Sequence, residues 1–199
     1  ECIDRPPEYD ILHKAHILCE SLAKSKLLYK GESKKVKYNI FGSVTGRLTT
    51  KKGSVPILTM KRQDRQDLKP NNDAFLELDF NAAEIRTLIA LSGKEQPETD
   101  IHSWVSQSVY DGKLPREKVK TKLFAWLYNS SASENELSNF FSRQIFRDFY
   151  CTETNTLETP YMRKIKVEER KAQNYLLQST TSDIVLENAY KIMNILSGK

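Results

Sequence analysis

The fold of this 199-residue chain is decided by one stretch of sequence, Asp79-Phe80-Asn81-Ala82-Ala83-Glu84-Ile85-Arg86. An apolar run at residues 74–78 precedes it and is typical of a β-strand. A helical pattern of apolar residues follows it over residues 82–91. The sequence therefore predicts that Asp79 lies where a strand stops and a helix begins. A carboxylate in that position is suited to holding Mg²⁺ beside a bound nucleotide, and a helix cap or turn is the alternative.

A second pattern lies downstream, in a helix predicted over residues 115–128, where Pro115 suits the first turn. Four side chains four residues apart fall on one stripe of this helix: Arg116, Lys120, Phe124 and Tyr128. The opposite face is apolar and is predicted to be buried: Val119, Leu123, Trp126 and Leu127. Two cations and two aromatic rings on an exposed stripe fit a nucleotide. An amphipathic helix with solvated cations is the alternative, and the spacing alone does not decide between them.

Charge is distributed unevenly along the chain, whose net charge is +5. Residues 24–69 hold 13 Lys or Arg and three acidic residues, whereas residues 71–100 hold seven acidic residues and two basic ones. A basic block beside an acidic one suits a grip on a phosphate backbone next to a cation site. Solvated surface charge is the alternative explanation.

The composition is that of a globular protein, with 39% hydrophobic and 29% charged residues. No apolar run approaches the roughly 20 residues that a membrane span needs, so no contact with a membrane is expected. The three cysteines are widely spaced and form neither a disulfide framework nor a zinc pattern. These features favour a reducing compartment, and we expect a cytoplasmic protein.

The remaining patterns predict a mixed α/β (α+β) fold that is mostly helical. We expect helices over residues 8–29, 100–110, 133–149 and 168–196 and a strand over 36–41. We also expect an extended loop over 42–72 and a hairpin or loop over 152–167.

Five motifs, in order along about residues 20–195, together resemble the family A (Pol I-like) DNA polymerases. They are Thr45-Gly46-Arg47-Leu48, the stretch 79–86, Asp100-Ile101-His102, the 116–128 stripe, and the residues at 169, 170, 174, 178, 180 and 183. The resemblance implies the right-hand polymerase fold, with an antiparallel palm sheet and a helical fingers insertion. Residues 1–30 would then lead from thumb into palm, 31–97 would form the palm, 98–150 the fingers, and 151–199 the return to the palm with the long primer–template helix.

The family's activity implies template-directed DNA synthesis, in which a deoxynucleoside triphosphate is added to the 3′-hydroxyl of primed DNA with two Mg²⁺ ions. The resemblance places Asp79 and the Phe80 carbonyl on the metal. Arg116 and Lys120 would bind the triphosphate, with Lys120 also a proton donor to the pyrophosphate leaving group.

Other roles also come from the resemblance. The family pattern implies that Phe124 packs on the sugar, that Tyr128 and Glu84 form a gate against a 2′-hydroxyl, and that His102 lies near the triphosphate. The residues implied to contact primer–template are Arg47, Arg170, Asn174 and Gln178. The family pattern also allows a processivity factor as a partner.

Departures from the family pattern indicate a divergent branch, such as a phage or viral one. Asn129 stands where a glycine is usual, and Ala82 and Ala83 replace larger residues. The usual C-terminal His-Asp-Glu motif is absent, so no second catalytic carboxylate is found. We therefore expect the chain to be part of a longer protein and residues 1–199 alone to be inactive in DNA synthesis.

Two other functions compete with a DNA polymerase core. One is the related single-subunit RNA polymerase, which Glu84 argues against because a carboxylate there fills the space that a ribose 2′-hydroxyl needs. The other is a non-catalytic DNA-binding module of polymerase ancestry. Retention of Asp79, Arg116, Lys120 and Tyr128 argues against it, because binding alone does not require all four.

Overall fold

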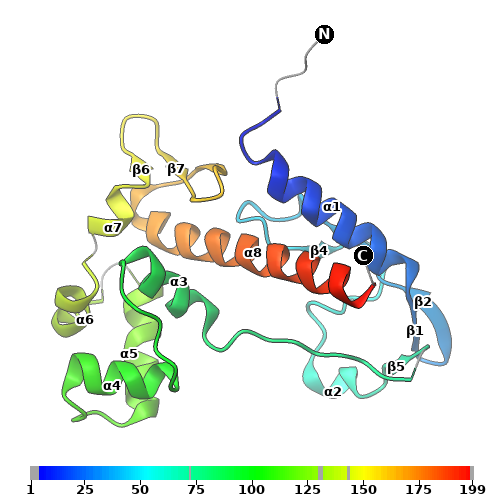
Figure 1. The fold of residues 1–199 in the computed structure, drawn as a ribbon, viewed down its shortest axis with the longest axis horizontal. Coiled ribbons are helices and arrows are strands. Elements are labelled where there is room, and N and C mark those ends of the chain that lie inside the picture. The colour runs from blue at the N-terminus through cyan, green and yellow to red at the C-terminus, as the bar shows by residue number, and fades with distance from the viewer. Residues whose placement is uncertain (1–4, 72, 130–131, 143, 198–199) are drawn as a thin grey trace. The chain divides into compact units, whose positions relative to one another are not determined.

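The protein is described by a computed structural model that covers residues 5–71, 73–129, 132–142 and 144–197 (Figure 1). The chain divides into two compact units, which we describe one at a time. Unit 1 is Glu1–Asp79 with Ser182–Lys199, and unit 2 is Phe80–Thr181. Helices predominate and the sheets are small and antiparallel, which confirms the predicted mixed α/β fold.

Unit 1 begins with helix α1 (Tyr9–Lys24), which buries Ile11, Ala15 and Leu18 along one face. The following strands form two small sheets. The first has the order β2-β1-β5, and the second pairs β3 with β4; their bounds are β1 (Lys26–Tyr29), β2 (Glu32–Lys35), β3 (Tyr38–Asn39), β4 (Thr49–Thr50) and β5 (Lys69–Pro70). A short helix, α2 (Arg62–Arg65), precedes β5. A small apolar cluster that includes Leu27, Val36, Val55 and Met60 forms the core beside these strands.

Unit 2 is built mainly from helices. Its elements are α3 (Ala83–Leu91), α4 (Ile101–Tyr110), α5 (Arg116–Tyr128), α6 (Asn135–Phe140), α7 (Gln144–Arg147), β6 (Tyr150–Cys151), β7 (Thr156–Glu158) and β8 (Lys164–Lys166). The long helix α8 (Glu169–Leu196) begins in unit 2 and ends in unit 1. The antiparallel sheet β6-β7-β8 confirms the hairpin predicted over residues 152–167.

The core of unit 2 gathers apolar side chains from α3, α4, α5, α6, β7, β8 and the first half of α8. A buried hydrogen bond adds to this packing, because the hydroxyls of Thr87 on α3 and Thr181 on α8 lie 2.8 Å apart. The Thr87 hydroxyl also lies 3.0 Å from the Ala83 carbonyl, which it can reach as a donor. Buried hydroxyls need such partners, since an unpaired one costs about 1–3 kcal/mol.

Helix α5 matches its prediction in both bounds and orientation. Val119, Leu123 and Trp126 are wholly buried, and Leu127 is nearly so. The predicted stripe of Arg116, Lys120, Phe124 and Tyr128 is exposed. The apolar face therefore fixes which way the polar and aromatic stripe points.

The strand predicted over residues 74–78 is wrong. Residues 74–80 are extended but form no strand within the part of the chain that the structure describes. The apolar side chains Phe75, Leu76 and Leu78 are 54%, 67% and 61% exposed. A strand requires a hydrogen-bonded neighbour as well as apolar side chains, and no described segment pairs with this one.

The helix predicted over residues 8–29 is too long. It ends at Lys24, and the apolar residues after it belong to strand β1. Leu27 and Leu28 pair with β2 on one side and with β5 on the other. The apolar spacing that had predicted further helical turns therefore belongs to a strand, because Leu27 and Leu28 pair with neighbouring strands.

Three other segments also differ from their predictions. Residues 36–41 do not form one strand, since β2 ends before them and β3 covers only Tyr38–Asn39. The predicted loop over residues 42–72 contains β4, α2 and β5. The helix predicted over residues 133–149 is split into α6 and α7, because Phe141 leaves the helical conformation while its side chain stays buried.

Leu123 provides a direct test of the packing of α5. Replacing this wholly buried residue by alanine should lower the free energy of unfolding by about 2–5 kcal/mol, through lost apolar contact and the cavity left behind. Urea denaturation followed by circular dichroism measures this loss. The control Lys118→Ala, on the exposed side of the same helix, should change stability by less than about 0.5 kcal/mol. Equal effects of the two changes would contradict the buried orientation of Leu123.

Candidate functional site

Helix α5 is held in place at its C-terminal end by two neighbouring helices. The Gln173 side-chain amide on α8 donates to the Leu127 carbonyl at 3.2 Å and to the Trp126 carbonyl at 3.4 Å. The Trp126 indole donates to the Ser138 hydroxyl of α6 at 2.9 Å. The last carbonyls of a helix have no partner within it, so Gln173 satisfies groups that would otherwise need water.

The start of α4 is joined to the start of α5 by an ion pair. The Arg116 guanidinium donates to both carboxylate oxygens of Asp100, from Nε at 3.0 Å and from Nη2 at 2.9 Å. Asp100 is also the N-cap of α4, and its Oδ2 accepts from the backbone N–H of Ser103 at 3.0 Å. One carboxylate therefore caps α4 and fixes Arg116 in a two-pronged geometry.

The same contacts determine the charge of Asp100. The hydrogen bonds from the Arg116 guanidinium hold the pKa of Asp100 well below its usual range, although partial burial opposes them. The backbone and hydroxyl of Ser103 act in the same direction as Arg116. Asp100 is therefore ionised at any physiological pH.

His102 lies beside the stripe on α5, and its side chain is buried. Its Nδ1 has no hydrogen-bond partner within the described residues. Burial lowers the pKa of His102; Asp100 opposes this shift, while the cations Arg116 and Lys120 add to it. The imidazole is therefore neutral near pH 7, with an unused polar atom.

Three rings form a row that starts at His102. The His102 and Phe124 ring centroids are 6.3 Å apart and the rings are tilted by 46°. The Phe124 and Tyr128 rings are stacked, with centroids 5.8 Å apart and an angle of 14°. The row runs along α5 next to its cations, so it offers flat apolar surface beside positive charge.

Lys120 differs from the two cations of this helix that are paired. Arg116 is paired with Asp100 and Glu117, and Lys122 is paired with Glu134 at 2.6 Å. Lys120 is exposed and forms no salt bridge with any residue that the structure describes. Its ammonium group is therefore free to bind an anion.

Asp79 and Phe80 lie in the exposed extended segment that leads to α3. Ala82 turns the chain into the helix with a left-handed backbone (φ 50°), which is uncommon for a residue other than glycine. Arg86 supports this turn: its side chain donates to the carbonyl of Asn81 at 3.0 Å and to that of Pro97 at 3.0 Å. Glu84, in the first turn of α3, is half-buried.

The predicted metal ligands do not form a cluster in this structure. Within the described ranges, no three His, Cys, Asp or Glu side chains are grouped so that they could hold a metal ion. Asp79 belongs to unit 1, as does the exposed Arg47, whereas the stripe on α5 belongs to unit 2. The structure thus brings together His102, Arg116, Lys120, Phe124 and Tyr128.

The three predicted DNA-binding residues of α8 follow one another at intervals of four along the helix. Arg170 is exposed and pairs with Glu168 at 2.6 Å. It lines a hollow of about 320 Å³ together with Arg147, Tyr150 and Gln173. Farther along, the Gln178 amide donates to the Asn174 side-chain oxygen at 2.6 Å.

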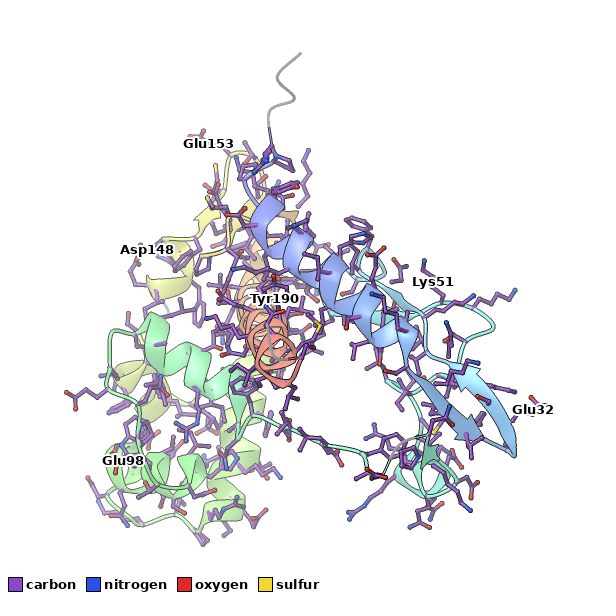
Figure 2. All side chains as sticks on the ribbon, turned by 45° about the vertical axis from the view of Figure 1, so that its right-hand side comes forward. Glu32, Lys51, Glu98, Asp148, Glu153 and Tyr190 are labelled. Carbon is purple, nitrogen blue, oxygen red and sulfur yellow. The ribbon has the colours of Figure 1, made fainter. Side chains whose placement is uncertain are left out.

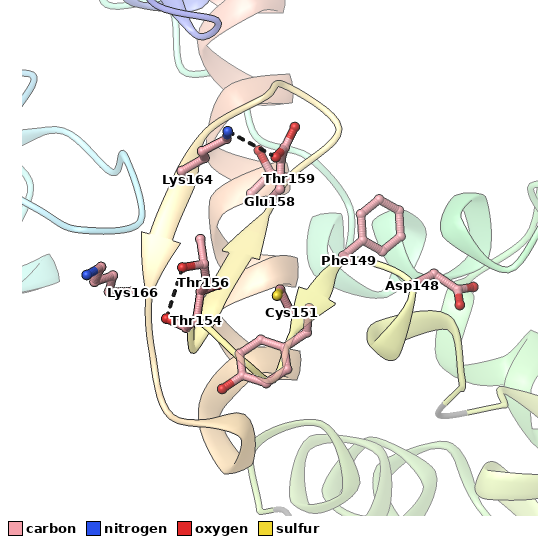
Figure 3. Close-up of a pocket in the computed structure, with 10 residues that line it drawn as sticks. Asp148, Phe149, Cys151, Thr154, Thr156, Glu158, Thr159, Lys164 and Lys166 are labelled. Atoms are coloured by element: carbon pink, nitrogen blue, oxygen red, sulfur yellow. Dashed lines mark hydrogen bonds and ion pairs between the residues drawn. The ribbon is translucent and has the colours of Figure 1, made fainter.

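A larger hollow of about 770 Å³ lies on the sheet β6-β7-β8 (Figure 3). Its walls carry polar side chains that partly satisfy one another. Lys164 pairs with Glu158 at 3.6 Å, and the Thr156 hydroxyl donates to the Thr154 carbonyl at 3.2 Å. None of the predicted site residues lines this hollow, so it is separate from the candidate nucleotide site.

The overall fold is similar to that of a solved polymerase structure. This structure is described as the POL domain of Pol1 from M. smegmatis in complex with DNA primer-template and dNTP. The similarity has a TM-score of 0.62 at 16% sequence identity, and it covers 96% of this chain and 42% of that chain. The chain has a Pol I-like fold. No protein-family model and no curated protein matches the sequence.

The structure also adds to what the sequence suggested. The polymerase-domain fold supports the predicted fold class. The roles of Gln173 and Asp100 in positioning α5 were not predicted. Asp100 was identifiable as a helix cap, but nothing in the sequence pointed to its contact with Arg116, 16 residues away. Among the described residues, no helix combines the length and apolar character that a membrane crossing requires.

The Asp100–Arg116 pair should make stability depend on pH. Asp100→Asn keeps a good helix cap but removes the charge that Arg116 binds, so the urea midpoint should fall at pH 7. Because the pKa of Asp100 is lower in the folded protein than in the unfolded chain, the pair stabilises the fold above about pH 4 and loses this effect as the pH falls further. The difference between variant and wild type should therefore shrink in acid.

The matched control is Asp111→Asn. Asp111 pairs with Lys113 at 3.0 Å, but both side chains are more than three-quarters exposed. This change should have almost no effect at any pH. A constant difference between Asp100→Asn and wild type from pH 7 to pH 2 would contradict the role of the ion pair.

Proposed function

We propose that this chain carries the nucleotide-binding part of a template-directed DNA polymerase, which joins deoxynucleotides to a primer 3′-hydroxyl. The observation that carries the proposal is the exposed row on α5, in which Arg116 and Lys120 precede the stacked rings of Phe124 and Tyr128. Support comes from the fold, since the similar M. smegmatis structure was determined with primer-template and dNTP. The chain spans 42% of the length of that protein.

The triphosphate would bind at the N-terminal half of α5. Lys120 has no competing carboxylate among the described residues and would contact the phosphates directly. Arg116 would exchange the Asp100 carboxylate for phosphate oxygens, because both present the same pair of acceptors to a guanidinium. Lys120 is also the group that would donate a proton to departing pyrophosphate.

The sugar and base would lie farther along the same helix. The Phe124 and Tyr128 rings provide a flat surface for the sugar, and Tyr128 with Glu84 would exclude a 2′-hydroxyl. His102 adds a neutral polar group behind this row. His102 would lie near the triphosphate through its place beside Phe124, and as a neutral ring it would add no further charge to the site.

The metal requirement is proposed through Asp79. Mg²⁺ is commonly held by one or two carboxylates together with substrate phosphates and water. The exposed Asp79 carboxylate and the Phe80 carbonyl fit that pattern as partial ligands beside a triphosphate. When bound, two Mg²⁺ ions would offset the charge of the triphosphate and activate the primer oxygen.

Primer–template would be bound by side chains outside α5. The proposed contacts are Arg47 of unit 1 and, on α8, Arg170, Asn174 and Gln178. Arg170 lines a hollow that is also lined by Arg147 and Glu169. Two guanidinium groups close together favour phosphate oxygens as ligands.

Nucleotide binding tests the proposal on this chain directly. Lys120→Gln should weaken the affinity for a deoxynucleoside triphosphate at least about tenfold, because a charge-assisted hydrogen bond contributes roughly 1.5–3 kcal/mol. Isothermal titration calorimetry measures the change. Lys118→Gln, the same substitution two residues earlier on the exposed side of α5, is the control and should bind like wild type. A similar loss in both variants would indicate general attraction to positive charge and contradict a built site.

Asp79 tests the catalytic part of the proposal. Asp79→Ala should lower Mg²⁺-dependent primer extension by several orders of magnitude in the intact protein and leave its affinity for primed DNA within about twofold. The reason is that the carboxylate acts on charge that develops in the transition state. Glu77→Ala removes an equally exposed carboxylate two residues earlier and should leave extension unchanged. Undiminished extension by Asp79→Ala would remove this residue from the mechanism.

A further inference from the structure

A groove of about 480 Å³ lies in unit 1, between α1 and the segment that contains β3 and β4. Three lysines line it, namely Lys35, Lys37 and Lys51, the last of which is labelled in Figure 2. The aromatic side chain of Phe41 lies on the same wall and is 73% exposed. Its volume falls within the range of roughly 300–1,000 Å³ that is typical of small-molecule binding sites.

The backbone holds two of these lysines opposite each other. The Lys51 N–H donates to the Lys37 carbonyl at 2.8 Å, which continues the antiparallel ladder of Tyr38 with Thr50 by one residue. Residues directly opposite in such a ladder point to the same face of the sheet. Like charges in that arrangement repel each other and destabilise the sheet.

The third lysine is in a similar position. Lys35 lies opposite Lys26 in the pairing of β2 with β1. Ser54 joins this segment to the first pair, since its hydroxyl accepts from the Lys37 N–H at 2.7 Å and donates to the Lys35 carbonyl at 3.4 Å. The backbone therefore holds the lysines together despite their repulsion.

No carboxylate of the described residues neutralises this cluster. Lys35, Lys37 and Lys51 form no salt bridge with any of them. Glu20, the acidic residue among those that line the groove, lies 3.3 Å from the His16 imidazole and forms no salt bridge with these lysines. The repulsion between these lysines lowers the stability of the fold, and no described carboxylate offsets it. Such a cluster indicates a site for an anion.

Phe41 narrows the class of anion. The Asn39 side-chain oxygen accepts from the Phe41 N–H at 3.0 Å and fixes the backbone that carries the ring. An alternative explanation of the lysines is that they keep the edge of the sheet from pairing with other strands. That explanation does not account for the exposed aromatic ring beside them. Cations beside an exposed ring are the combination that binds single-stranded nucleic acid, with phosphates on the cations and a base stacked on the ring.

We propose that this groove binds a short stretch of single-stranded DNA. Phosphates contact Lys35, Lys37 and Lys51, and a base stacks on Phe41. The choice of DNA rests on the proposed function, but the groove lies wholly in unit 1 and uses none of the residues of the nucleotide site on α5.

The test compares two double variants with the same change in charge. Lys37→Gln/Lys51→Gln alters the groove, and Lys52→Gln/Lys61→Gln alters two exposed lysines outside it. Affinity for a thymidine oligonucleotide is measured by filter binding over a range of salt concentrations, with a chelator present and without nucleotide. The groove variant should bind at least tenfold more weakly, and the slope of log affinity against log salt should fall by about 1.4, for two contacts at about 0.7 each. The control should stay within about threefold of wild type.

Stability provides the second measurement. Because the groove variant removes repulsion between facing lysines, its urea midpoint should equal or exceed that of wild type, which excludes misfolding as the cause of weaker binding. Phe41→Ala should weaken oligonucleotide binding about tenfold without changing the salt slope, and it should leave the affinity for a duplex of the same length unchanged.

Several results would overturn the proposal. One is an equal loss of oligonucleotide affinity in the two double variants, or a salt slope that is unchanged in the groove variant. Another is a groove variant that is less stable than wild type. The last two are an unchanged affinity of Phe41→Ala and competition by polyglutamate as strong as by the oligonucleotide. Lys120→Gln separates this proposal from the nucleotide site. It should leave oligonucleotide binding intact, just as the groove variant should leave triphosphate binding intact, so either proposal can fail alone.

Discussion

The burial of one face of α5 is the constraint on which the candidate site depends. Val119, Leu123 and Trp126 are wholly inside the core of unit 2, which prevents rotation of the helix about its axis. Because side chains four residues apart share a stripe, this single constraint orients Arg116, Lys120, Phe124 and Tyr128 together. Gln173 and Ser138 then fix the position of the helix along that axis. The chemistry of the surface is thus set by apolar packing beneath it.

Two carboxylates, those of Asp100 and Glu117, pair with the cation at the start of α5. Asp100 caps α4 and also forms an ion pair with Arg116, the first cation of α5, so one carboxylate links the starts of the two helices. This ion pair also neutralises Arg116, so Lys120 is the cation of the exposed stripe that attracts an anion most strongly. Under the proposed function, an incoming phosphate would meet Lys120 first and compete with Asp100 for Arg116.

The sequence predicted those features that depend on local periodicity. The bounds and the two faces of α5 were correct because a helix satisfies its hydrogen bonds within itself, so the spacing of Leu123 and its neighbours is sufficient. The strand at residues 74–78 was wrong because pairing needs a second segment, which no local pattern describes. The same reason explains the end of α1, where Leu27 joins a sheet. The Asp100–Arg116 contact and the facing lysines of unit 1 depend on which elements meet, and they were found only in the structure.

The packing of Trp126 has a practical consequence for the study of this protein. The chain contains two tryptophans, Trp104 on α4 and Trp126 on α5, and both lie in unit 2. Trp126 is wholly buried with its indole bonded to Ser138, while the Trp104 ring meets Phe140 edge-on at 5.7 Å. Unit 1 contains tyrosine and phenylalanine but no tryptophan. Fluorescence excited at the red edge of protein absorbance therefore comes only from the helices around the candidate site. The chain has its own optical reporter there without any label.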